Sequence, residues 1–286
     1  MSSLIGIRRR IRSTKNIAQI TKAMQMVSAS KMRRAQDAAL ATRPFTDKLR
    51  EILTRVTQKA GDVTPHGLTV DRPEERILIA MISTNKGLCG GLNVNLHRGY
   101  AAFVAEHPSA KISVATVGKK GRWVIAGREV ALAARFDDLH EYPSFEETRT
   151  IAQFAMDSFL AGQFDSVYLA YPKFLTTLTS EVTVQKLLPV SAKDSRADAP
   201  ITEYKIEPDP ASLLEKLLPY QVEMSVHQSI LEARATEHSA RMVAMKNASD
   251  NARDLISSLT LDYNSARQSQ VTSELLDVTT ARMALE

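Results

Sequence analysis

The residues best placed to do chemistry lie in a glycine-rich stretch, residues 84–93 (TNKGLCGGLN). The stretch follows an apolar run and precedes a predicted helix, which is where phosphate-binding loops lie in α/β folds. A P-loop places its lysine after the last glycine and beside Ser or Thr, whereas Lys86 precedes the glycines, and G-x-G-x-x-G spacing is absent. We interpret the stretch as a tight turn in which Gly87, Gly90 and Gly91 supply unusual backbone angles. A nucleotide-dependent enzyme using Lys86 remains an alternative.

Other reactive side chains are scattered. The six histidines include no two within four residues, so no helical metal pair is expected. Cys89 is the one cysteine, which excludes an internal disulfide and a cysteine-rich zinc site. We expect Cys89 to be a buried structural side chain. The sequence thus predicts no catalytic residue, no metal and no cofactor.

Positive charge gathers near the N-terminus, in Arg8, Arg9, Arg10 and Arg12, within a chain whose net charge is only +5. Basic helical arms of this kind can grip nucleic acid. No aromatic side chain that would stack on bases follows before Phe45. Composition therefore favours a solvated or partner-facing helix. A basic coiled-coil nucleic-acid-binding protein remains a second alternative.

Glycine and proline divide the chain into three parts. Residues 7–43 and 220–286 contain neither residue and are rich in strong helix formers. They predict a helix from about 3 to 58, with a possible kink at Pro44, and a second helix from about 208 to the C-terminus, kinked or restarted at Pro219.

An apolar stripe runs along each predicted helix, and helices this long need a partner for it. We expect the two to form an antiparallel pair, assisted by a basic first flank and an acidic last flank. The expected stripe of the first helix comprises Ile17, Ile20, Met24, Val27, Met32, Ala35, Ala39, Phe45, Leu49, Ile52 and Val56. That of the second comprises Ile230, Ala233, Ala240, Ala244, Ala248, Ala252, Leu255, Leu259, Tyr263 and Ala266.

The middle of the chain alternates between strand and helix patterns, which favours a mostly parallel sheet covered by helices. Strands are expected at 76–82, 111–117, 129–136, 167–171 and 181–187, and helices at 92–106, 119–127 and, capped by Ser144, 145–161. The predicted fold class is α/β, with a long antiparallel coiled coil of N- and C-terminal helices and a small Rossmann-like domain. The expected parts are a shaft helix (1–60), an α/β domain (75–192) and a second shaft helix (208–286).

Four segments resemble the γ subunit of F-type ATP synthases of the bacterial type. They are residues 20–36 (ITKAMQMVSASKMRRAQ), 237–252 (EHSARMVAMKNASDNA), 263–274 (YNSARQSQVTSE) and the glycine-rich stretch at 86–93. The resemblance extends along the whole chain in order. It implies a non-catalytic rotor shaft that couples proton flow through the membrane c-ring to the conformational cycling of the catalytic β subunits.

The resemblance also implies partners and a location. The partners would be the α and β subunits of the catalytic hexamer, the ε subunit and the c-ring, with no nucleic acid. The chain would lie on the cytoplasmic side of the bacterial inner membrane, as a peripheral part of the complex.

Particular residues match the family's contact positions. Those implied to meet the α and β subunits are Met24, Arg241, Arg267, Gln268, Thr272 and Glu274, and those implied to meet ε and the c-ring are Tyr204 and Glu207. The last turns depart from the family, since Ala281 and Arg282 stand where a Gly-Ala pair is common. Alanine extends a helix more readily than glycine does.

Overall fold

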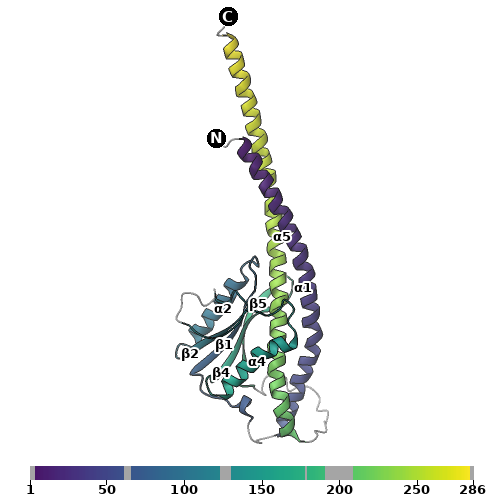
Figure 1. Cartoon of the computed structure of the whole chain (residues 1–286), viewed down its shortest axis with the longest axis vertical. Coiled ribbons are helices and arrows are strands. Elements are labelled where there is room, and N and C mark those ends of the chain that lie inside the picture. Colours follow the sequence, from purple (N-terminus) through teal and green to yellow (C-terminus); the bar gives the residue numbers. More distant parts are fainter. Residues whose placement is uncertain (1–3, 61–65, 123–129, 178, 191–208, 284–286) are drawn as a thin grey trace. The chain divides into compact units, whose positions relative to one another are not determined.

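The computed structural model describes residues 4–60, 66–122, 130–177, 179–190 and 209–283 (Figure 1). The chain forms two compact units, one of residues 1–28 with 241–286 and the other of residues 29–240. Two long helices, α1 (Leu4–Ala60) and α5 (Pro210–Met283), each contribute to both units.

The predicted terminal helices are confirmed, and each continues through an internal proline. Pro44 lies inside α1 and Pro219 inside α5, so Pro219 does not restart the helix. A proline removes one backbone hydrogen bond of a helix. Around Pro219 the buried Leu218 and Val222 belong to the main hydrophobic core, and this packing keeps α5 continuous.

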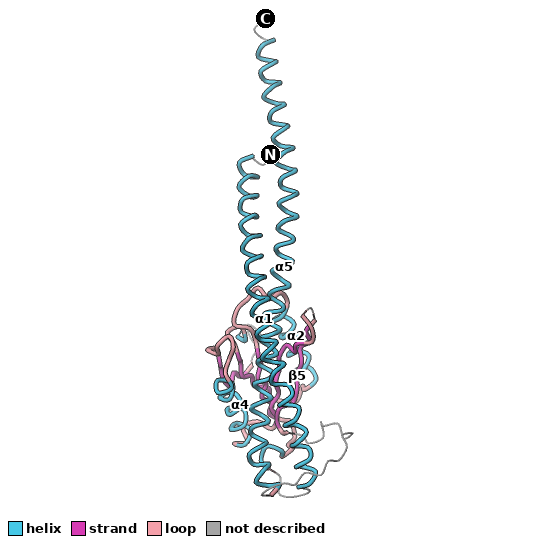
Figure 2. Tube along the Cα trace, turned by 90° about the vertical axis from the view of Figure 1, so that its right-hand side faces the viewer, coloured by secondary structure: helices cyan, strands magenta, loops and turns pink. Residues whose placement is uncertain are grey.

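In the first unit, the N-terminal half of α1 lies beside α5 in the antiparallel direction in both views, and the last turns of α5 continue beyond the start of α1 (Figures 1 and 2). Each contributes a stripe of buried and half-buried side chains that recurs at alternating spacings of three and four, which is the seam of a coiled coil. On α1 the stripe is Leu4, Ile7, Ile11, Thr14, Ala18, Thr21, Gln25 and Ser28. On α5 it is Met245, Ser249, Ala252, Ile256, Leu259, Tyr263 and Ala266.

The predicted face of α1 is wrong in this unit. Ile17, Ile20 and Val27 were expected in the seam but are 51%, 59% and 54% exposed. The seam instead buries Thr14 and Thr21, whose hydroxyls donate 2.9 Å hydrogen bonds to carbonyl oxygens four residues earlier. A hydroxyl satisfied by its own helix can be buried at little cost, so polar residues take the seam positions.

Other predicted stripe positions are also exposed. On α5, Leu255 is exposed and the next residue, Ile256, is half-buried, while Met245 and Ser249 are more buried than the predicted Ala244 and Ala248. In the second unit, Phe45 and Ile52 of α1 are exposed, while Leu49 and Leu53 are buried.

The second unit contains a five-stranded sheet in the order β3-β2-β1-β4-β5. Strands β1, β2, β3 and β4 are parallel, and β5 joins β4 antiparallel, so the mostly parallel sheet is confirmed. The bounds are β1 Arg76–Ile82, β2 Lys111–Val117, β3 Ala131–Phe136, β4 Ser166–Phe174 and β5 Ser180–Leu188. Part of the helix predicted at 119–127 lies outside the described residues.

Each face of the sheet packs against helices. Alternate residues of β1 point to opposite faces, as the two-residue period of a strand requires. Ile77, Ile79 and Met81 pack with α2 (Leu92–Glu106), whereas Leu78, Ala80 and Ile82 belong to the larger core formed with α1, α4 (Phe145–Leu160) and α5. Helices therefore cover both faces of this sheet, as parallel sheets require.

Helix α4 begins at the predicted capping box. The Ser144 side chain accepts a hydrogen bond from the Glu147 backbone N–H at 3.3 Å, and the Glu147 carboxylate accepts one from the Ser144 N–H at 2.8 Å. Two backbone donors of the first turn are thereby satisfied. The cap fixes where the loop from β3 enters α4.

Replacing the capping hydroxyl tests this contribution. Ser144→Ala removes the acceptor for the Glu147 N–H, so we expect the free energy of unfolding to fall by about 1 kcal/mol. Urea unfolding of the full chain measures this difference. Ser144→Thr keeps the hydroxyl and serves as the control; an equal loss in both variants would contradict the assignment.

The same cap predicts a pH dependence. Hydrogen bonds from the His140 ring and the Ser144 backbone hold the pKa of Glu147 at about 2, below its ordinary 4.5. Hydrogen bonding to Glu147 in turn raises the pKa of His140 above its ordinary 6.5. The Glu147 carboxylate stabilises the fold fully above pH 4.5, and this stabilisation is lost as the pH falls toward about 2. The His140 imidazolium stabilises the fold fully below pH 6.5, and this stabilisation is lost as the pH rises through the raised pKa of His140.

We therefore expect Glu147→Gln to destabilise the chain most at intermediate pH. Urea unfolding of both chains at about pH 3, 5.5 and 8.5 measures the difference, which should be largest at the middle value. The His140→Gln background supplies the control. Without the imidazole, the destabilisation caused by Glu147→Gln should no longer decrease between about pH 5.5 and 8.5. A difference independent of pH would argue against the pair.

Candidate functional site

The glycine-rich turn follows β1 at the carboxyl edge of the sheet, where ligands bind in doubly wound folds. Gly90 has a φ of +60° and Leu88 one of +61°, so two residues of the turn adopt left-handed backbone. The predicted tight turn is confirmed, but its glycine assignments hold only at Gly90. Gly91 has a φ of −82°, Gly87 lies outside the left-handed region, and Leu88 takes that conformation instead.

Side chains of the turn bond to one another. The Asn93 amide donates to the Thr84 hydroxyl at 2.8 Å and lies 3.7 Å from the Cys89 sulfur. That sulfur is in turn 4.0 Å from the Lys86 carbonyl oxygen, and the cysteine is buried as predicted. These contacts fix the turn from within.

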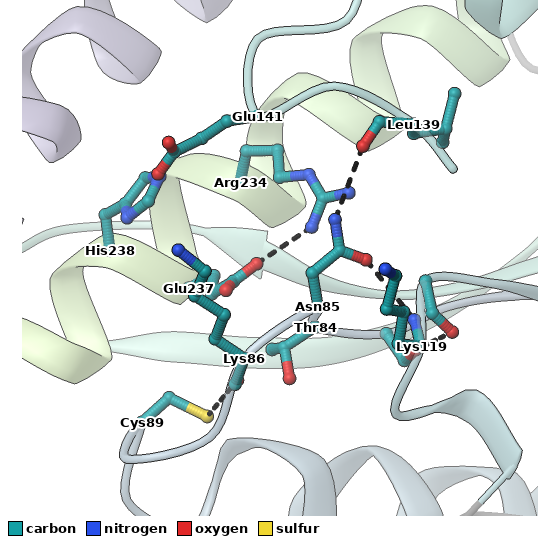
Figure 3. Close-up of polar contacts among 12 residues, drawn as sticks. Thr84, Asn85, Lys86, Cys89, Lys119, Leu139, Glu141, Arg234, Glu237 and His238 are labelled. Atoms are coloured by element: carbon teal, nitrogen blue, oxygen red, sulfur yellow. Dashed lines mark hydrogen bonds and ion pairs between the residues drawn. The ribbon is translucent and has the colours of Figure 1, made fainter. Parts of the chain in front are cut away.

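The Asn85 side chain joins three loops at this edge (Figure 3). Its carbonyl oxygen accepts from the Lys119 backbone N–H at 3.3 Å, and its amide nitrogen donates to the Leu139 carbonyl oxygen at 3.4 Å. Close packing here requires glycine at position 118, because a Cβ there would lie 2.6 Å from the Ser83 carbonyl oxygen and the φ is +92°. The loops after β1, β2 and β3 are therefore held together.

Charged residues of α5 lie against the same edge. The Arg234 guanidinium donates to the Glu237 carboxylate at 2.9 Å, and their side chains are only 4% and 6% exposed. Figure 3 shows the Lys86 side chain running toward α5, where Glu237 and His238 lie. Buried ions need partners, and the Arg234 Nη1 and Glu237 carboxylate supply one for each charge, whereas Nε and Nη2 of Arg234 have no hydrogen-bond partner among the described residues. The edge that holds a ligand in other doubly wound proteins here holds a helix.

A single and a double substitution test the buried pair. Glu237→Ala leaves the Arg234 guanidinium buried without its carboxylate, so we expect the free energy of unfolding to fall by about 3–5 kcal/mol. Arg234→Met combined with Glu237→Met removes both charges and should cost much less. Urea unfolding of the two variants decides the point, and an equal or greater cost for the double variant would refute it.

Two of the residues implied by the resemblance lie on the paired parts of the long helices. Met24 is half-buried on α1, and Arg241 is buried on α5. Tyr204 and Glu207 lie outside the described residues.

The other four implied residues lie close together on α5. Arg267, Gln268, Thr272 and Glu274 are all exposed. The Thr272 hydroxyl donates to the Gln268 backbone oxygen at 2.9 Å, and Glu274 accepts from the Gln270 amide at 2.8 Å. The Arg267 and Gln268 side chains are thus presented to solvent on adjoining faces of one helix.

The N-terminal arginines do not hold the helix pair together by charge. Arg8, Arg9, Arg10 and Arg12 are exposed, and none forms an ion pair with another described residue. The expectation that opposite charges assist the pairing is therefore not met at these four residues. Packing of the seam carries the pairing there.

Sequence reasoning missed the buried pair of Arg234 and Glu237, which lie three residues apart on α5 and are buried only in the folded chain. It also missed Glu141, which lies in the loop between β3 and α4, far from α5 in the sequence. The one available signal was charge on a predicted buried stretch: Glu232, Arg234 and Glu237 interrupt the apolar run of α5. Such charges indicate a buried ion pair but do not name its neighbours.

Both units agree with a fold found in rotary ATP synthases. The rotor of the Euglena gracilis mitochondrial ATP synthase is similar with a TM-score of 0.63 and 20% identity, covering 94% of this chain and 98% of that one. The central stalk and c-ring structure of the Tetrahymena thermophila mitochondrial ATP synthase is similar with a TM-score of 0.59 and 24% identity, covering 80% and 99%. Both likenesses concern the fold.

Comparison of sequences identifies the family. The ATP synthase family profile matches residues 3–285, so the chain belongs to that family. Its curated relatives include bacterial ATP synthase gamma chains: those of Dehalococcoides mccartyi (strain BAV1) and Pelotomaculum thermopropionicum are 42% and 41% identical over the full length of both chains. This similarity fits the resemblance to γ subunits and neither alternative, the nucleic-acid-binding coiled coil or the nucleotide-dependent enzyme.

No helix among the described residues combines the length and the apolar character needed to cross a bilayer.

Proposed function

We propose that this chain is the central rotor shaft of a bacterial F-type ATP synthase. The observation that carries the proposal is full-length similarity to gamma chains, at about 40% identity without a gap in coverage. Its partners are the α and β subunits of the catalytic hexamer, the ε subunit and the c-ring. The chain itself is not catalytic, and it joins the inner membrane peripherally, on the cytoplasmic side, through the complex.

The paired helices support a mechanical role. A coiled-coil seam excludes water along both helices and fixes their register. Rotation of the c-ring, driven by proton flow, turns the sheet domain and with it the helices. Because the chain lacks rotational symmetry, each orientation presents a different surface to each β subunit, which drives ATP synthesis or hydrolysis.

The last turns of α5 expose an apolar surface, which indicates a partner that encloses them. Val271, Leu275, Leu276, Val278 and Met283 are all exposed. Soluble proteins rarely leave such large apolar side chains in one contiguous stretch of surface. We assign this stretch to the part of the catalytic hexamer that surrounds the end of the shaft.

Polar contacts to the hexamer are assigned by family position. Arg267 and Gln268 bind polar loops of β, and Met24, Arg241, Thr272 and Glu274 complete the contacts to α and β. Tyr204 and Glu207 meet ε and the c-ring. An arginine forms charge-assisted hydrogen bonds with fixed geometry, which suits a contact made at one rotary position and broken at the next.

Assembly tests the proposed function. The tagged chain, co-expressed with the α, β and ε subunits of its own source, should purify as a complex that hydrolyses ATP. The same subunits without this chain are the control for assembly that does not depend on it. If the chain fails to bring down α and β while the control subunits are folded, the proposal is refuted.

A double substitution tests the contact residues. Arg267→Ala with Gln268→Ala removes several polar contacts, so we expect weaker rotor torque and slower ATP-driven proton pumping, with the isolated fold unchanged because both side chains are exposed. Single-molecule rotation and proton pumping in membrane vesicles measure these effects. Ser269→Ala, at an adjacent exposed position, is the matched control. Unchanged torque and pumping in the double variant would refute these two assignments.

A further inference from the structure

One carboxylate in the second unit contacts both long helices. Glu141 lies in the loop between β3 and α4, where the Lys31 ammonium of α1 is 2.7 Å from each of its two oxygens. The His238 Nε2 atom of α5 lies 3.4 Å from Oε1 of the same carboxylate. Figure 3 shows the Glu141 and His238 side chains together. A single side chain thus touches α1 and α5 at once.

Neighbouring contacts strengthen this connection. The Tyr142 hydroxyl donates to the Lys31 backbone oxygen at 3.5 Å, and the Tyr142 ring lies 6.4 Å from the His238 ring. From the β4–β5 hairpin, the Thr177 backbone oxygen accepts a hydrogen bond from the Ser239 hydroxyl. Two loops of the sheet domain therefore hold successive residues of α5.

The loop that carries Glu141 is itself anchored to the sheet. Asn85 donates to the Leu139 carbonyl oxygen at 3.4 Å, and Ser144 begins the capped helix α4. His140 bonds to Glu147 in the first turn of that helix. The residues before and after Glu141 are therefore bonded to the sheet edge and to α4. Because of these bonds, a displacement of the sheet also moves the Glu141 carboxylate.

The carboxylate remains charged at neutral pH. Partial burial alone would raise the pKa of Glu141, but the Lys31 ammonium, assisted by the charges of His238 and Lys86, holds it below the ordinary 4.5. The contact to Lys31 is therefore charge-assisted and stronger than a hydrogen bond between neutral groups.

The contacts of Glu141 lie near both ends of the second unit. Lys31 and His238 lie within three residues of the ends of the second unit, which comprises residues 29–240. Two other ionic contacts of the unit each join α5 to one element: Arg149 of α4 pairs with Glu223, and Arg43 of α1 pairs with Glu232.

We propose that Glu141 is a positioning residue that transmits torque from the sheet domain to both helices together. The inference rests on the proposed rotor function. Hydrophobic packing joins both helices to the sheet at and below Leu49 of α1 and Ala233 of α5. The Glu141 carboxylate adds a polar contact to both helices beyond these core residues, so it couples the pair to the loop at this level.

The exposure of the Glu141–Lys31 pair indicates that its role is not to stabilise the fold. The Glu141 and Lys31 side chains are 39% and 32% exposed. Ion pairs this exposed contribute little to the free energy of unfolding. Loss of Glu141 should therefore change the mechanics of the assembled rotor far more than the stability of the chain.

The test uses the assembled catalytic complex with the α and β subunits fixed to a surface. A bead attached to an introduced cysteine at the exposed Lys111 reports torsional fluctuations of the stalled rotor. We expect Glu141→Gln and Glu141→Ala to lose torsional stiffness while the rate of ATP hydrolysis without load is unchanged. Glu141→Asp, which keeps the charge, should recover part of the stiffness.

Two controls make each outcome decisive. Glu146→Gln removes a more exposed carboxylate five residues further on and should leave stiffness unchanged. Urea unfolding of the full chain should have the same midpoint in wild type and Glu141→Gln. Unchanged torsional stiffness in both Glu141 variants overturns the proposal. An equal loss of stiffness in Glu146→Gln also overturns it. So does a lower unfolding midpoint in Glu141→Gln that accompanies the loss of stiffness. Failure of the wild-type chain to assemble with α and β would instead refute the rotor function.

Discussion

The seam between the two terminal helices sets the constraint on which the rest of the structure depends. Buried and half-buried side chains recur along α1 at alternating spacings of three and four from Leu4 to Val56, an average period of about 3.5. An α-helix has 3.6 residues per turn, so a stripe of this period stays on one face only if the helices wind around each other with a left-handed supercoil. The seam therefore requires a partner helix along its length, and α5 supplies it in the first unit.

Polar residues in this seam are satisfied without the partner. Thr14 and Thr21 bond to carbonyl oxygens of their own helix, so the partner helix contributes packing rather than specific hydrogen bonds at these positions. Small side chains, including Ala252 and Ser249 on α5, let helix backbones approach closely. Pairing by shape leaves charged and large apolar side chains for the outer surface, where an enclosing complex would meet them.

At the carboxyl edge of the sheet, too, polar side chains are bonded within the protein. The first turn of a doubly wound fold ordinarily positions a ligand. Here Asn85 bonds to neighbouring loops, and the buried Arg234–Glu237 pair of α5 lies against the same edge. The polar groups of the turn at this edge bond to neighbouring loops and to one another. A fold common among nucleotide-binding proteins can in this way serve as the base of a mechanical element, because its loops converge on one edge whatever lies there.

The sequence by itself determined the elements of this protein. Long helices, the β1, β2 and α2 bounds, and the Ser144 cap follow from the distribution of glycine and proline, from hydrophobic period and from local hydrogen bonding, all of which act over a few residues. Tertiary structure decided which helix face is buried and which charges meet. Ile17 and Ile20 are as apolar as a seam residue, yet Thr14 and Thr21 are buried, because the register of the pair is set by α5, more than two hundred residues away. Glu141, Lys31 and His238 likewise come together only once the sheet has placed its loops beside both helices.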